Sequence, residues 1–523
     1  MVTTSRTSPA AGSLNSSSRR DALDRLAAGE PVDLVVIGGG ATGAGVALDA
    51  ATRGLSVVLL EAHDLAFGTS RWSSKLIHGG LRYLASGALG LALESARERH
   101  VLLTRTAPHL VRPLPYVLPL AEHLDPKQGA AMRGGLALGD AMRMIARTPG
   151  AALPRSRRIG AVEARHLVPG LDPQRLRGAI LGWDGQLEDD ARLVVGIART
   201  AAAHGADVLT GFSVTHAVPG DVRATDRETG ETIRLAPRAV INATGVWAGT
   251  LAGDVQLRPS RGSHLVFAPE AFGGAVRAQV SIPLAGQFGR FLLAIPRPDG
   301  TVILGLTDEA VDGPIPDAPE PSAAEIAFLL EHGSEVFRRP LGTDQILGAY
   351  AGLRPLVAGG EDATADLSRS HLVHEGTDGL VTITGGKLTT YRQMAEDAVD
   401  RAVALTGLAA GPCRSRDTPL LGAAPPRSLA QVMAPRRLVE RHGVEALRVL
   451  ALAAAHPELA VPVVPGSDVL AAELAWAVRH EGARSVSDVL DRRTRLGLQP
   501  ALRAAAEPTA VRVLEAFGGE DVR

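Results

Sequence analysis

The segment Ser73–Tyr83, with the sequence SSKLIHGGLRY, gathers the side chains best suited to chemistry on a phosphorylated molecule. Gly79 and Gly80 expose backbone N–H groups, and Arg82 can place a guanidinium fork on phosphate oxygens while Tyr83 donates its hydroxyl. A surface charge beside an ordinary turn is the alternative interpretation of Arg82. These residue types favour a site that binds a phosphate group.

Three more residues further along the chain are candidates for chemistry. His264 follows Arg-Gly-Ser and enters a predicted strand, and an imidazole with its ordinary pKa of about 6.5 suits general base catalysis. Arg354 has an apolar setting between leucine and proline, where a buried charge needs a partner. Arg354 can instead lower the pKa of a substrate hydroxyl, which makes a dedicated base less necessary. Arg369 is a weaker candidate, for which a solvated surface is the alternative.

A strand, a turn, a helix and a second strand precede these residues in the order of a dinucleotide-binding unit. The first strand, Asp33–Ile37, runs into a glycine-rich turn, and a helix is predicted over Val46–Arg53. The second strand, Ser56–Leu60, ends at an acidic residue. Glycine-rich loops also occur as plain turns, so the order of the surrounding elements makes the signal specific.

Four residues of this unit have defined tasks if a dinucleotide binds. Gly38 permits the tight turn, Gly40 lets the backbone approach a pyrophosphate, and Gly43 allows close packing of helix on strand. The phosphates are expected at the helix N-terminus. Glu61, about 20 residues further on, can accept both ribose hydroxyl protons and would repel a 2′-phosphate, so NADP is disfavoured.

Two other segments predict further parts of the same unit. An apolar strand over Arg238–Asn242 breaks at Ala-Thr-Gly and leads into a helix, as a second cofactor strand would. Asp189 and Asp190 precede a long amphipathic pattern that ends at about His204. Both carboxylates are therefore predicted to be helix N-caps.

Residues 262–307 predict a hairpin-rich sheet that would form a platform over the cofactor. The apolar strands Arg290–Ile295 and Thr301–Leu306 flank Asp299-Gly300, which is a strong turn dipeptide.

The composition is that of an ordinary soluble globular protein. With 55 Lys+Arg against 56 Asp+Glu the net charge is -1 at pH 7, so no overall positive field favours nucleic acid. Cys413 is the only cysteine, which excludes an internal disulfide framework, and no Cys/His cluster has zinc spacing. A reducing cytoplasm and no bound metal are expected. No apolar run of about 18 residues predicts a membrane span.

The length of 523 residues allows two or three domains. Residues 1–30 are predicted to be a disordered N-terminal tail, because the first 20 are rich in Ser, Thr and Arg without the apolar core of a signal peptide. Residues 31–410 are expected to interleave a dinucleotide-binding domain with a substrate domain, whose sheet lies around 262–370. The proline-rich stretch 411–428 predicts a linker, and 429–523 a small helical domain.

From about Asp33 to Leu498 the chain resembles the FAD-dependent glycerol-3-phosphate dehydrogenases of the aerobic flavoprotein type. Seven motifs in family order carry the resemblance: GGGxxGAG (38–45), SSKLIHGGLRY (73–83), DDARL (189–193), NATG (242–245), GSH (262–264), GLRPL (352–356) and GGKLTTY (385–391). Any one of them can arise by chance, but not all seven in order. The chain departs from the family at Arg71-Trp72, Leu306 and Arg261, which leaves the fine substrate contacts open.

The resemblance implies an α/β fold of D-amino-acid-oxidase-like architecture: a Rossmann-like FAD-binding domain interleaved with an antiparallel-sheet substrate domain, plus a C-terminal helical domain. It also implies oxidation of sn-glycerol 3-phosphate to dihydroxyacetone phosphate by hydride transfer to noncovalent FAD, with electrons passed to a membrane quinone. On this basis His264 and Arg354 are the expected catalytic residues. The expected substrate-binding residues are Arg82, Tyr83, Lys387 and Arg369.

The residues expected to bind FAD come from four parts of the chain. They are Gly38, Gly40, Gly43 and Glu61; Ser70, Ser73, Ser74, Lys75, His78, Gly79 and Gly80; Thr244 and Gly245; and Gly385, Gly386, Leu388 and Thr389. Capping residues are the structural alternative for Ser73, Ser74 and Lys75. Changing Lys75 is expected to weaken FAD retention, whereas changing Arg82 is expected to spare FAD and raise the substrate requirement.

The turn Gly385-Gly386-Lys387 follows an apolar strand and opens a predicted helix. Its free N–H groups and the positive end of the helix dipole can face the flavin pyrimidine, where negative charge develops on reduction. Lys387 adds a positive charge for the flavin or for a phosphate. An ordinary helix start is the alternative.

Three other functions remain open from the sequence. An oxygen-using glycerol-3-phosphate oxidase would share the fold, although the extra insertion that some such oxidases carry has no obvious room here. An amine or 2-hydroxyacid oxidoreductase would also share it, but three basic candidates suit a phosphate dianion better than one carboxylate. A non-catalytic flavin-binding redox module would leave Arg82 and Arg354 unexplained.

A quinone acceptor requires docking at a membrane surface, at the inner face of the cell membrane. Residues 127–147 place Lys127, Arg133, Arg143 and Arg147 among Met132, Leu136, Leu138, Met142, Met144 and Ile145, a pattern compatible with a basic interfacial helix. A helix packed on the core is an equal alternative, and Gly134-Gly135 weakens the helix. Replacing Arg143 and Arg147 with Glu is expected to release the protein from anionic vesicles. A homodimer is compatible with the sequence, which does not determine the oligomeric state.

Overall fold

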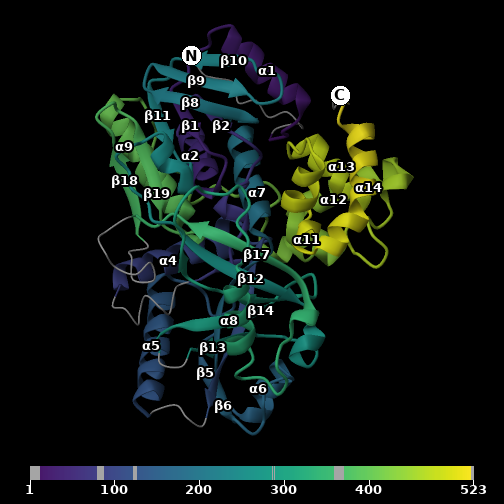
Figure 1. Cartoon of the computed structure of the whole chain (residues 1–523). Coiled ribbons are helices and arrows are strands. Elements are labelled where there is room, and N and C mark those ends of the chain that lie inside the picture. Colours follow the sequence, from purple (N-terminus) through teal and green to yellow (C-terminus); the bar gives the residue numbers. More distant parts are fainter. Residues whose placement is uncertain are drawn as a thin grey trace.

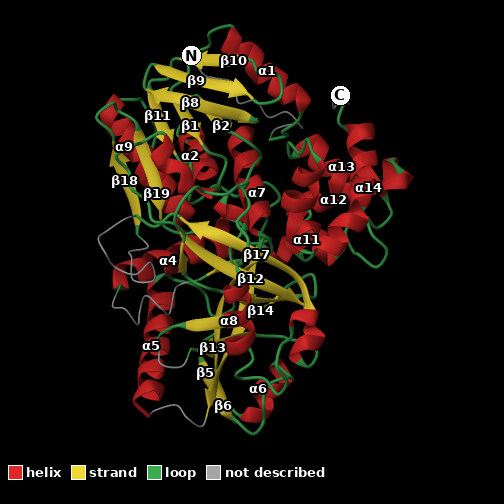
Figure 2. Ribbon diagram, in the orientation of Figure 1, coloured by secondary structure: helices red, strands yellow, loops and turns green. Residues whose placement is uncertain are grey.

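The computed structural model of the chain describes residues 12–78, 88–121, 126–284, 287, 289–357 and 370–519. Figure 1 shows two sheet-containing regions, one above the other, and a group of C-terminal helices at their side. Figure 2 shows the same division by secondary structure, with the strands gathered in the two regions and helices at the C-terminal side.

The upper region is built on a sheet in which strand β1 (Leu34–Ile37) is central. It pairs in parallel with β2 (Val57–Glu61) on one side and with β11 (Ala239–Asn242) on the other. Within the described residues the strand order is β18-β19-β11-β1-β2-β7, and β18 is antiparallel to its neighbour. The outer strands are β7 (Asp207–Thr210), β18 (His371–Glu375) and β19 (Val381–Gly385).

Both faces of this sheet are covered, which is why its central strand β1 is apolar and buried at every position. Val36 and Leu59 belong to one core with helices α2 (Ala41–Thr52), α7 (Asp190–Ala203) and α9 (Tyr391–Thr406). Val35 and Leu60 face the opposite core, which is closed by a small antiparallel sheet. That sheet contains β8 (Phe212–Val218), β9 (Asp221–Asp226) and β10 (Thr232–Leu235). The Rossmann-like prediction is confirmed.

The first helix begins earlier than predicted. Helix α2 starts at Ala41 rather than Val46, with Gly40 as its N-cap, so Gly43 and Gly45 lie inside the helix. The glycines suggested a longer turn, because glycine is unfavourable in helix interiors. Gly43 lies where a Cβ would overlap the carbonyl oxygen of Gly38, so close helix–strand contact outweighs helix propensity here.

The prediction of a disordered N-terminal tail is wrong for residues 12–30. Helix α1 (Ser16–Ala27) begins at Asn15, whose side chain accepts a hydrogen bond from the Ser18 amide in a capping box. Arg19 pairs with Asp226 at 2.6 Å, and Ala22 is buried against the small sheet. The polar composition hid a helix that forms ion pairs with distant residues and packs Ala22, Leu23 and Leu26 against the core beside the small sheet. Residues 1–11 lie outside the described residues.

The lower region is a large, mostly antiparallel sheet, with the order β16-β12-β15-β14-β13-β4-β6-β3 in the part of the chain that the structure describes. Strand β17 adds to β12, and β5 adds to β6. The predicted hairpin around Asp299-Gly300 is present as β14 and β15 in antiparallel register. The strands are β3 (Leu76–Ile77), β4 (Val111–Ala121), β5 (Arg157–Ile159), β6 (Leu176–Leu187), β12 (Ser260–Phe267), β13 (Gln279–Pro283), β14 (Phe291–Pro296), β15 (Val302–Gly305), β16 (Glu309–Ala310) and β17 (Ile346–Arg354).

This sheet extends far outside the predicted range 262–370. Its long pair β4 and β6 comes from residues 111–187, before the second cofactor strand. Strand β4 was missed because it contains Pro113, Pro115 and Pro119, and proline lacks the N–H that a central strand donates.

Helices complete the two regions. Helix α8 (Ala323–Gly333) packs in the core of the large sheet, where Leu329 is buried in one cluster with Leu304 and Phe337. The other helices of the two regions are α4 (Leu89–Val101), η2 (Leu102–Thr106), α5 (Pro126–Ile145), α6 (Ala161–Leu167), and the short η1 (Thr69–Arg71), η3 (Gly245–Thr250), η4 (Pro269–Phe272), η5 (Thr343–Gln345) and η6 (Leu388–Thr390).

The C-terminal domain is helical and has its own core around the buried Trp476. Between α9 and this domain, the stretch predicted as a linker packs on the upper region: Leu420 is buried, and Ser415 donates to Asp49 of α2 at 2.7 Å. The helices are α10 (Pro426–Leu429), α11 (Arg436–His442), η7 (Gly443–Glu445), α12 (Ala446–Ala455), η8 (Pro457–Leu459), α13 (Ala471–His480), η9 (Asp488–Arg493), η10 (Leu496–Leu498) and α14 (Pro500–Phe517).

Among the described helices, none combines the length and the apolar character that crossing a membrane requires.

Candidate active site

A cavity of about 760 Å³ lies between the parallel sheet and the large antiparallel sheet. Its upper wall comes from the carboxyl ends of β1, β2 and β19, which is where ligands bind in open α/β sheets. Its lower wall comes from β12, β13, β14 and β17. The volume is within the range of cofactor sites. We call the part at β1 and β2 the dinucleotide end, and the part at β12 and β17 the reaction end.

The turn between β1 and α2 forms the dinucleotide end from backbone groups. Gly38 has a φ of +111°, and a Cβ at Gly40 would lie 3.1 Å from Ser70 Oγ. Ser70 Oγ accepts a hydrogen bond from the Ala41 amide at 2.9 Å, in the first turn of α2. Gly38, Gly40 and Ser70 line the cavity, whereas Gly43 serves the packing of α2 behind it. The positive N-terminus of α2 thus faces a cavity with room for a pyrophosphate.

Glu61, at the end of β2, faces the cavity and also holds the glycine turn. Its Oε2 accepts from the Gly39 amide at 2.6 Å, and its Oε1 accepts from the His63 amide at 2.8 Å. Burial raises the pKa of Glu61, while the two backbone N–H donors oppose that rise. Each oxygen keeps a second lone pair that could accept from a ribose hydroxyl, which stays a prediction.

The ends of β11 and β19 supply the next part of the wall. Thr244 and Gly245 line the cavity, and Asn242 orders them by accepting from the Thr244 hydroxyl at 2.7 Å. Gly385 and Gly386 have φ angles of +78° and +65°, which favour glycine. Leu388 and Thr389, which follow in η6, line the cavity as well. Glycine backbone, a helix N-terminus and an acidic strand end together fit FAD.

His264 occupies the reaction end, on β12. Its Nε2 lies 2.8 Å from Ser74 Oγ, and its ring stacks on Tyr350 of β17 with centroids 4.7 Å apart. Gly305 on the neighbouring strand makes room, because a Cβ there would overlap the imidazole ring. Nδ1 has no hydrogen-bond partner among the described residues.

The pKa of His264 differs from the ordinary value on which its prediction as a base relied. Burial lowers it to about 3, and the positive charges of Lys75 and Arg354 add to that effect. The imidazole is therefore neutral at physiological pH and is a weak base in the free protein.

Arg354 ends β17, opposite Ser260 on β12, and lines the cavity beside His264. Its Nη1 lies 3.2 Å from Asp308 Oδ1 and donates to Ser260 Oγ at 3.1 Å, while Nη2 donates to the Thr307 carbonyl at 3.1 Å. The acidic partner of this half-buried arginine is thus Asp308. A Cβ at Gly262 would overlap the guanidinium group, so glycine is needed beside it.

Lys387 lines the cavity between the two ends, and its Nζ donates to Ser95 Oγ of α4. Its position between the Gly385–Gly386 turn and the antiparallel sheet is compatible with contacts to either flavin or substrate.

Lys75 does not face the cavity, contrary to its prediction as a cofactor residue. It is fully buried behind the wall and pairs with Asp190 at 3.1 Å. Burial lowers its pKa to about 8, against the opposing effect of Asp190. Its neighbours Ser73 and Ser74 do line the cavity, as does His78. The sequence concealed this pair because its members are 115 residues apart.

The two carboxylates predicted as helix N-caps have different tasks. Asp189 is the N-cap of α7, since its side chain accepts from the Arg192 amide. Asp190 instead accepts from Ser73 Oγ at 2.8 Å and from the Ser73 amide at 2.9 Å. The N-cap prediction is therefore confirmed for Asp189 and wrong for Asp190.

Five predicted site residues lie outside the described residues. They are Gly79, Gly80, Arg82, Tyr83 and Arg369.

Several cavity residues were not predicted from the sequence. Trp72, Phe212, Arg290 and Asp308 all line it. Asp308 had a usable signal, because an arginine in an apolar setting requires an acidic partner. Phe212 had none, since it reaches the cavity from a strand of the small sheet.

Comparisons with known proteins place this geometry in a family. Residues 33–392 match the family described as FAD dependent oxidoreductase, and residues 413–519 match the C-terminal domain of alpha-glycerophosphate oxidase. Glycerol-3-phosphate dehydrogenase 1 of Mycobacterium tuberculosis is 50% identical over 499 residues, which cover 94% of this chain and 96% of the relative. Glycerol-3-phosphate dehydrogenase of a Synechocystis species is 32% identical, with 89% of each chain covered.

Solved structures agree with the sequence relatives. Glycerol-3-phosphate dehydrogenase from Bacillus halodurans, complexed with FAD, superposes with a TM-score of 0.75 at 27% identity, covering 98% of this chain and 95% of that one. L-alpha-glycerophosphate oxidase from Mycoplasma pneumoniae has a TM-score of 0.57 at 19% identity, a likeness of fold alone. The chain therefore belongs to the FAD-dependent oxidoreductases, in the branch whose curated members are glycerol-3-phosphate dehydrogenases.

Proposed function

We propose that this protein oxidises sn-glycerol 3-phosphate to dihydroxyacetone phosphate and passes the electrons to a membrane quinone. The observation that carries the proposal is that Arg354 and His264 line the same end of a cavity whose other end has the features of a dinucleotide site. FAD, when bound, supplies the acceptor for the hydride. The protein supplies the orientation of the substrate and the destination of its proton.

Arg354 is the proposed partner of the substrate. Its guanidinium presents a rigid set of donors that suits phosphate or hydroxyl oxygens, and Asp308 fixes its direction. Lys387 adds a second cation on the cavity wall. The relatives described above are named glycerol-3-phosphate dehydrogenases, which supports the same substrate for this protein.

His264 is the proposed acceptor of the hydroxyl proton. It is neutral in the free protein, so its lone pair is available at any pH well above about 3. A phosphate dianion entering the cavity raises the pKa of a nearby imidazole, because an opposite charge favours the protonated form. Ser74 keeps the ring in one orientation by its contact with Nε2. The general base thus becomes stronger when the substrate arrives.

Anaerobic titration of the FAD-bound protein tests this function. We expect glycerol 3-phosphate to bleach the oxidised flavin band, while glycerol, which lacks the phosphate, does not. Arg354→Ala should retain FAD but require far more substrate for bleaching. An unchanged flavin spectrum with glycerol 3-phosphate would remove the proposal.

The electron acceptor is tested separately. A quinone user gives little peroxide in air, and its turnover rises when a soluble quinone is added. The C-terminal match to an alpha-glycerophosphate oxidase domain makes oxygen the competing acceptor. Stoichiometric peroxide without quinone would establish the oxidase instead.

Docking at the inner face of the membrane is proposed through the end of α5. Met144 and Ile145 are about half exposed, at 53% and 56%, and Arg147 is exposed just after them. Arg143, which was predicted to share this surface, is buried and donates to the Thr148 carbonyl at 2.9 Å. The test therefore changes: Met144→Ser with Ile145→Ser and Arg147→Glu should reduce sedimentation with anionic vesicles, and unchanged sedimentation would contradict docking here.

A further inference from the structure

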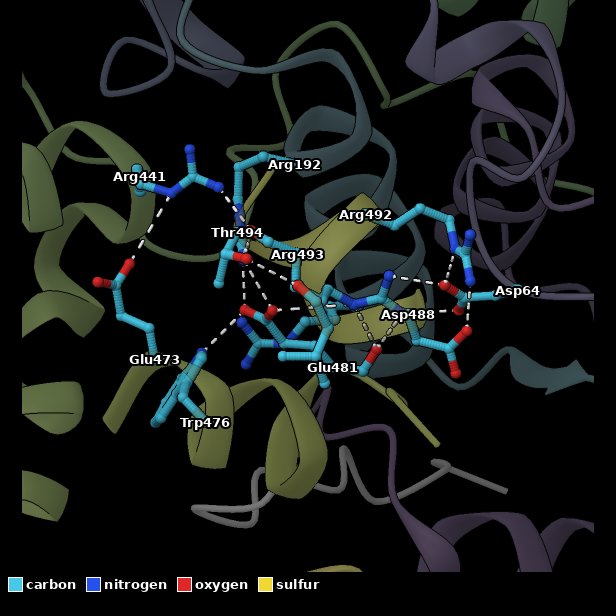
Figure 3. A network of polar contacts seen from close by, with 12 residues as sticks. Asp64, Arg192, Arg441, Glu473, Trp476, Glu481, Asp488, Arg492, Arg493 and Thr494 are labelled. Atoms are coloured by element: carbon cyan, nitrogen blue, oxygen red, sulfur yellow. Dashed lines mark hydrogen bonds and ion pairs between the residues drawn. The ribbon is translucent and has the colours of Figure 1, made fainter. Parts of the chain in front are cut away.

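The C-terminal domain reaches the wall of the cavity through a short segment, Arg492–Arg495, which we call the arginine segment. Arg492 Nε contacts Asp64 at 2.6 Å, and Arg493 Nη2 contacts the same carboxylate at 2.8 Å (Figure 3). Asp64 belongs to the loop after β2, and His63 and Phe67 of this loop line the cavity. The arginine segment thus supports one cavity loop from behind.

Arg495 reaches the next part of the same wall. Its Nη2 donates to the carbonyl of Arg71 at 2.6 Å, just before the cavity residues Trp72 to Ser74. Its Nε lies 3.0 Å from Asp189 Oδ2, and Nη2 lies 3.7 Å from Asp190 Oδ1. The side chain is only 6% exposed. Its contacts therefore join the C-terminal domain to the start of α7 and to the Ser73–Lys75 turn.

Four buried charges meet at this point: Lys75, Arg495, Asp189 and Asp190. Two are positive and two negative, so the group is neutral as a whole. Burial raises the pKa of Asp190, but Lys75 and Arg495 outweigh that effect and keep it ionised. Without Arg495 the two carboxylates would lose one of the buried cations that face them, which is unfavourable for charges held out of water. The cluster must then rearrange or admit water.

Asp190 fixes the turn that carries Ser74. One of its oxygens accepts from the Ser73 amide, the Ser73 hydroxyl and Lys75 Nζ, all within 3.1 Å. Tyr350 adds a bond to the Ser73 carbonyl at 3.1 Å and stacks on His264. The position of Ser74 Oγ against His264 Nε2 thus depends on a turn whose anchor is Asp190.

The backbone conformation of Lys75 and Arg495 is a second, independent indication that this cluster is held in place by its surroundings. Four described residues other than glycine have a positive φ, and two of them are Lys75 at +55° and Arg495 at +66°. Such residues are disfavoured in the left-handed region and persist where the surroundings hold them. Both cations of this cluster are therefore held in conformations that glycine would adopt more easily.

We propose that Arg495 is a positioning residue of the reaction site: from the C-terminal domain it fixes Asp189 and Asp190, and through them the turn that holds Ser74 against His264. The C-terminal domain is then a part of the site, although it does not line the cavity within the described residues. This inference rests on the proposed function for its kinetic readout.

The experiment compares Arg495→Met with Arg199→Met in the FAD-bound full-length protein. Methionine at 495 retains the backbone strain and loses only the guanidinium group. Arg199 is equally buried in the same domain interface, where it pairs with Glu445 at 2.7 Å, but it contacts no cavity loop. The readouts are FAD content, thermal unfolding, the rate of flavin reduction at saturating glycerol 3-phosphate, and the modification rate of His264 by diethyl pyrocarbonate in the FAD-free protein.

We expect Arg495→Met to slow flavin reduction by roughly 10- to 100-fold at saturating substrate, since small displacements of reacting groups have effects of this size. FAD content should stay at the wild-type level, and modification of His264 should speed up several-fold. Arg199→Met should lose a similar amount of thermal stability with a rate within about twofold of wild type. Equal slowing in both variants, or wild-type behaviour of Arg495→Met in both readouts, would overturn the proposal.

Arg495→Lys gives an independent decision if the methionine variant does not fold. Lysine restores the charge opposite Asp189 but lacks the fork that also reaches the Arg71 carbonyl, so a loss of roughly 3- to 10-fold in rate is expected. If Arg495→Lys had the wild-type rate of flavin reduction and the wild-type rate of His264 modification, the guanidinium group would not be needed and the proposal would be contradicted. If wild-type protein is not reduced by glycerol 3-phosphate, the proposed function fails, and His264 reactivity alone still decides this inference.

Discussion

The two ends of the cavity are built in opposite ways. The dinucleotide end consists largely of backbone from one continuous segment, with Gly38, Gly40 and Glu61 separated by fewer than 25 positions. The reaction end consists of side chains brought together from distant strands, such as His264 and Arg354. The first end should tolerate lost side chains but not added ones, and the second end should show the reverse.

The largest effect is expected at the reaction end, from Arg354→Ala. Loss of the guanidinium group breaks the ion pair with Asp308 and removes the proposed substrate contact, so kcat/KM should fall by about 10³-fold. Steady-state assays with a dye acceptor measure this. FAD content is the control and should not change. A decrease of less than about threefold would mean that the reaction end does not depend on this side chain.

The dinucleotide end is tested by adding one methyl group, in Gly43→Ala. The new Cβ would overlap the backbone carbonyl of Gly38, so α2 must shift and FAD binding should weaken by roughly 100-fold. The ratio of flavin to protein absorbance after dialysis gives the loss. Gly135→Ala in α5 is the matched control, because a Cβ there meets nothing within 4 Å and a helix gains from alanine. Full FAD retention in Gly43→Ala would show that the turn is not tightly packed.

A smaller effect is expected when a side chain of the dinucleotide end is changed, in Glu61→Gln. The amide keeps one acceptor for the Gly39 or His63 amide but loses the charge, so FAD affinity should fall by about tenfold. Flavin fluorescence quenching reports the dissociation constant. We expect only a tenfold loss because the dinucleotide end should tolerate the loss of a side-chain group. A 1000-fold loss of FAD affinity would contradict the proposed difference between the two ends of the cavity.

The smallest effect is expected in the pH dependence of folding stability. As pH falls, the residue of the reaction end, His264, should lower the stability, and the residue of the dinucleotide end, Glu61, should raise it. The pKa of His264 is about 3 in the folded protein, below the unfolded value, so the unfolded chain takes up more protons and stability is lost as pH falls below about 6.5. At pH 5.5 this amounts to about 1 kcal/mol. The pKa of Glu61 is raised on folding, so its contribution grows as pH falls.

Urea unfolding of the FAD-free protein at pH 7 and pH 5.5 measures this difference. His264→Gln should lose less stability than wild type over the interval, and Glu61→Gln should show no such gain relative to wild type, because the pKa of Glu61 is shifted in the direction that stabilises the fold at low pH. The same change in all three proteins would show that neither group titrates as its burial requires.

The difference between the dinucleotide end and the reaction end also explains how much of the site could be predicted from the sequence. The sequence predicted the β1–α2 turn, Glu61 and the Gly385–Gly386 turn as parts of the site. Each of them is formed by neighbouring residues, so its pattern is visible in a short stretch of sequence. His264 and Arg354 were predicted from the sequence as site residues, and both line the cavity. The residues that contact them were not predicted. The Lys75–Asp190 pair joins residues that sequence spacing does not relate, and His264 has a pKa set by burial among charges from other elements.

The fold shows the same division. The alternation between strands and helices predicted the parallel sheet and the β14–β15 hairpin. Strand β4 was hidden by its prolines, and helix α1 by a polar composition that becomes favourable only when Arg19 meets Asp226. In each case the missing information was a contact with a distant segment.

The strand order of the parallel sheet has a consequence for how the protein is made. Strand β1 needs β11 beside it, and β11 in turn needs β19, and these two strands lie about 200 and 340 residues after β1 in the chain. At roughly 5 to 20 residues per second of synthesis, the edge of β1 waits tens of seconds for its neighbours on that side. Pairings of such long range also close slowly. The nascent chain therefore carries an open strand edge on this sheet until β19 has been made, and the lining of the cavity is complete only after Met394 has emerged.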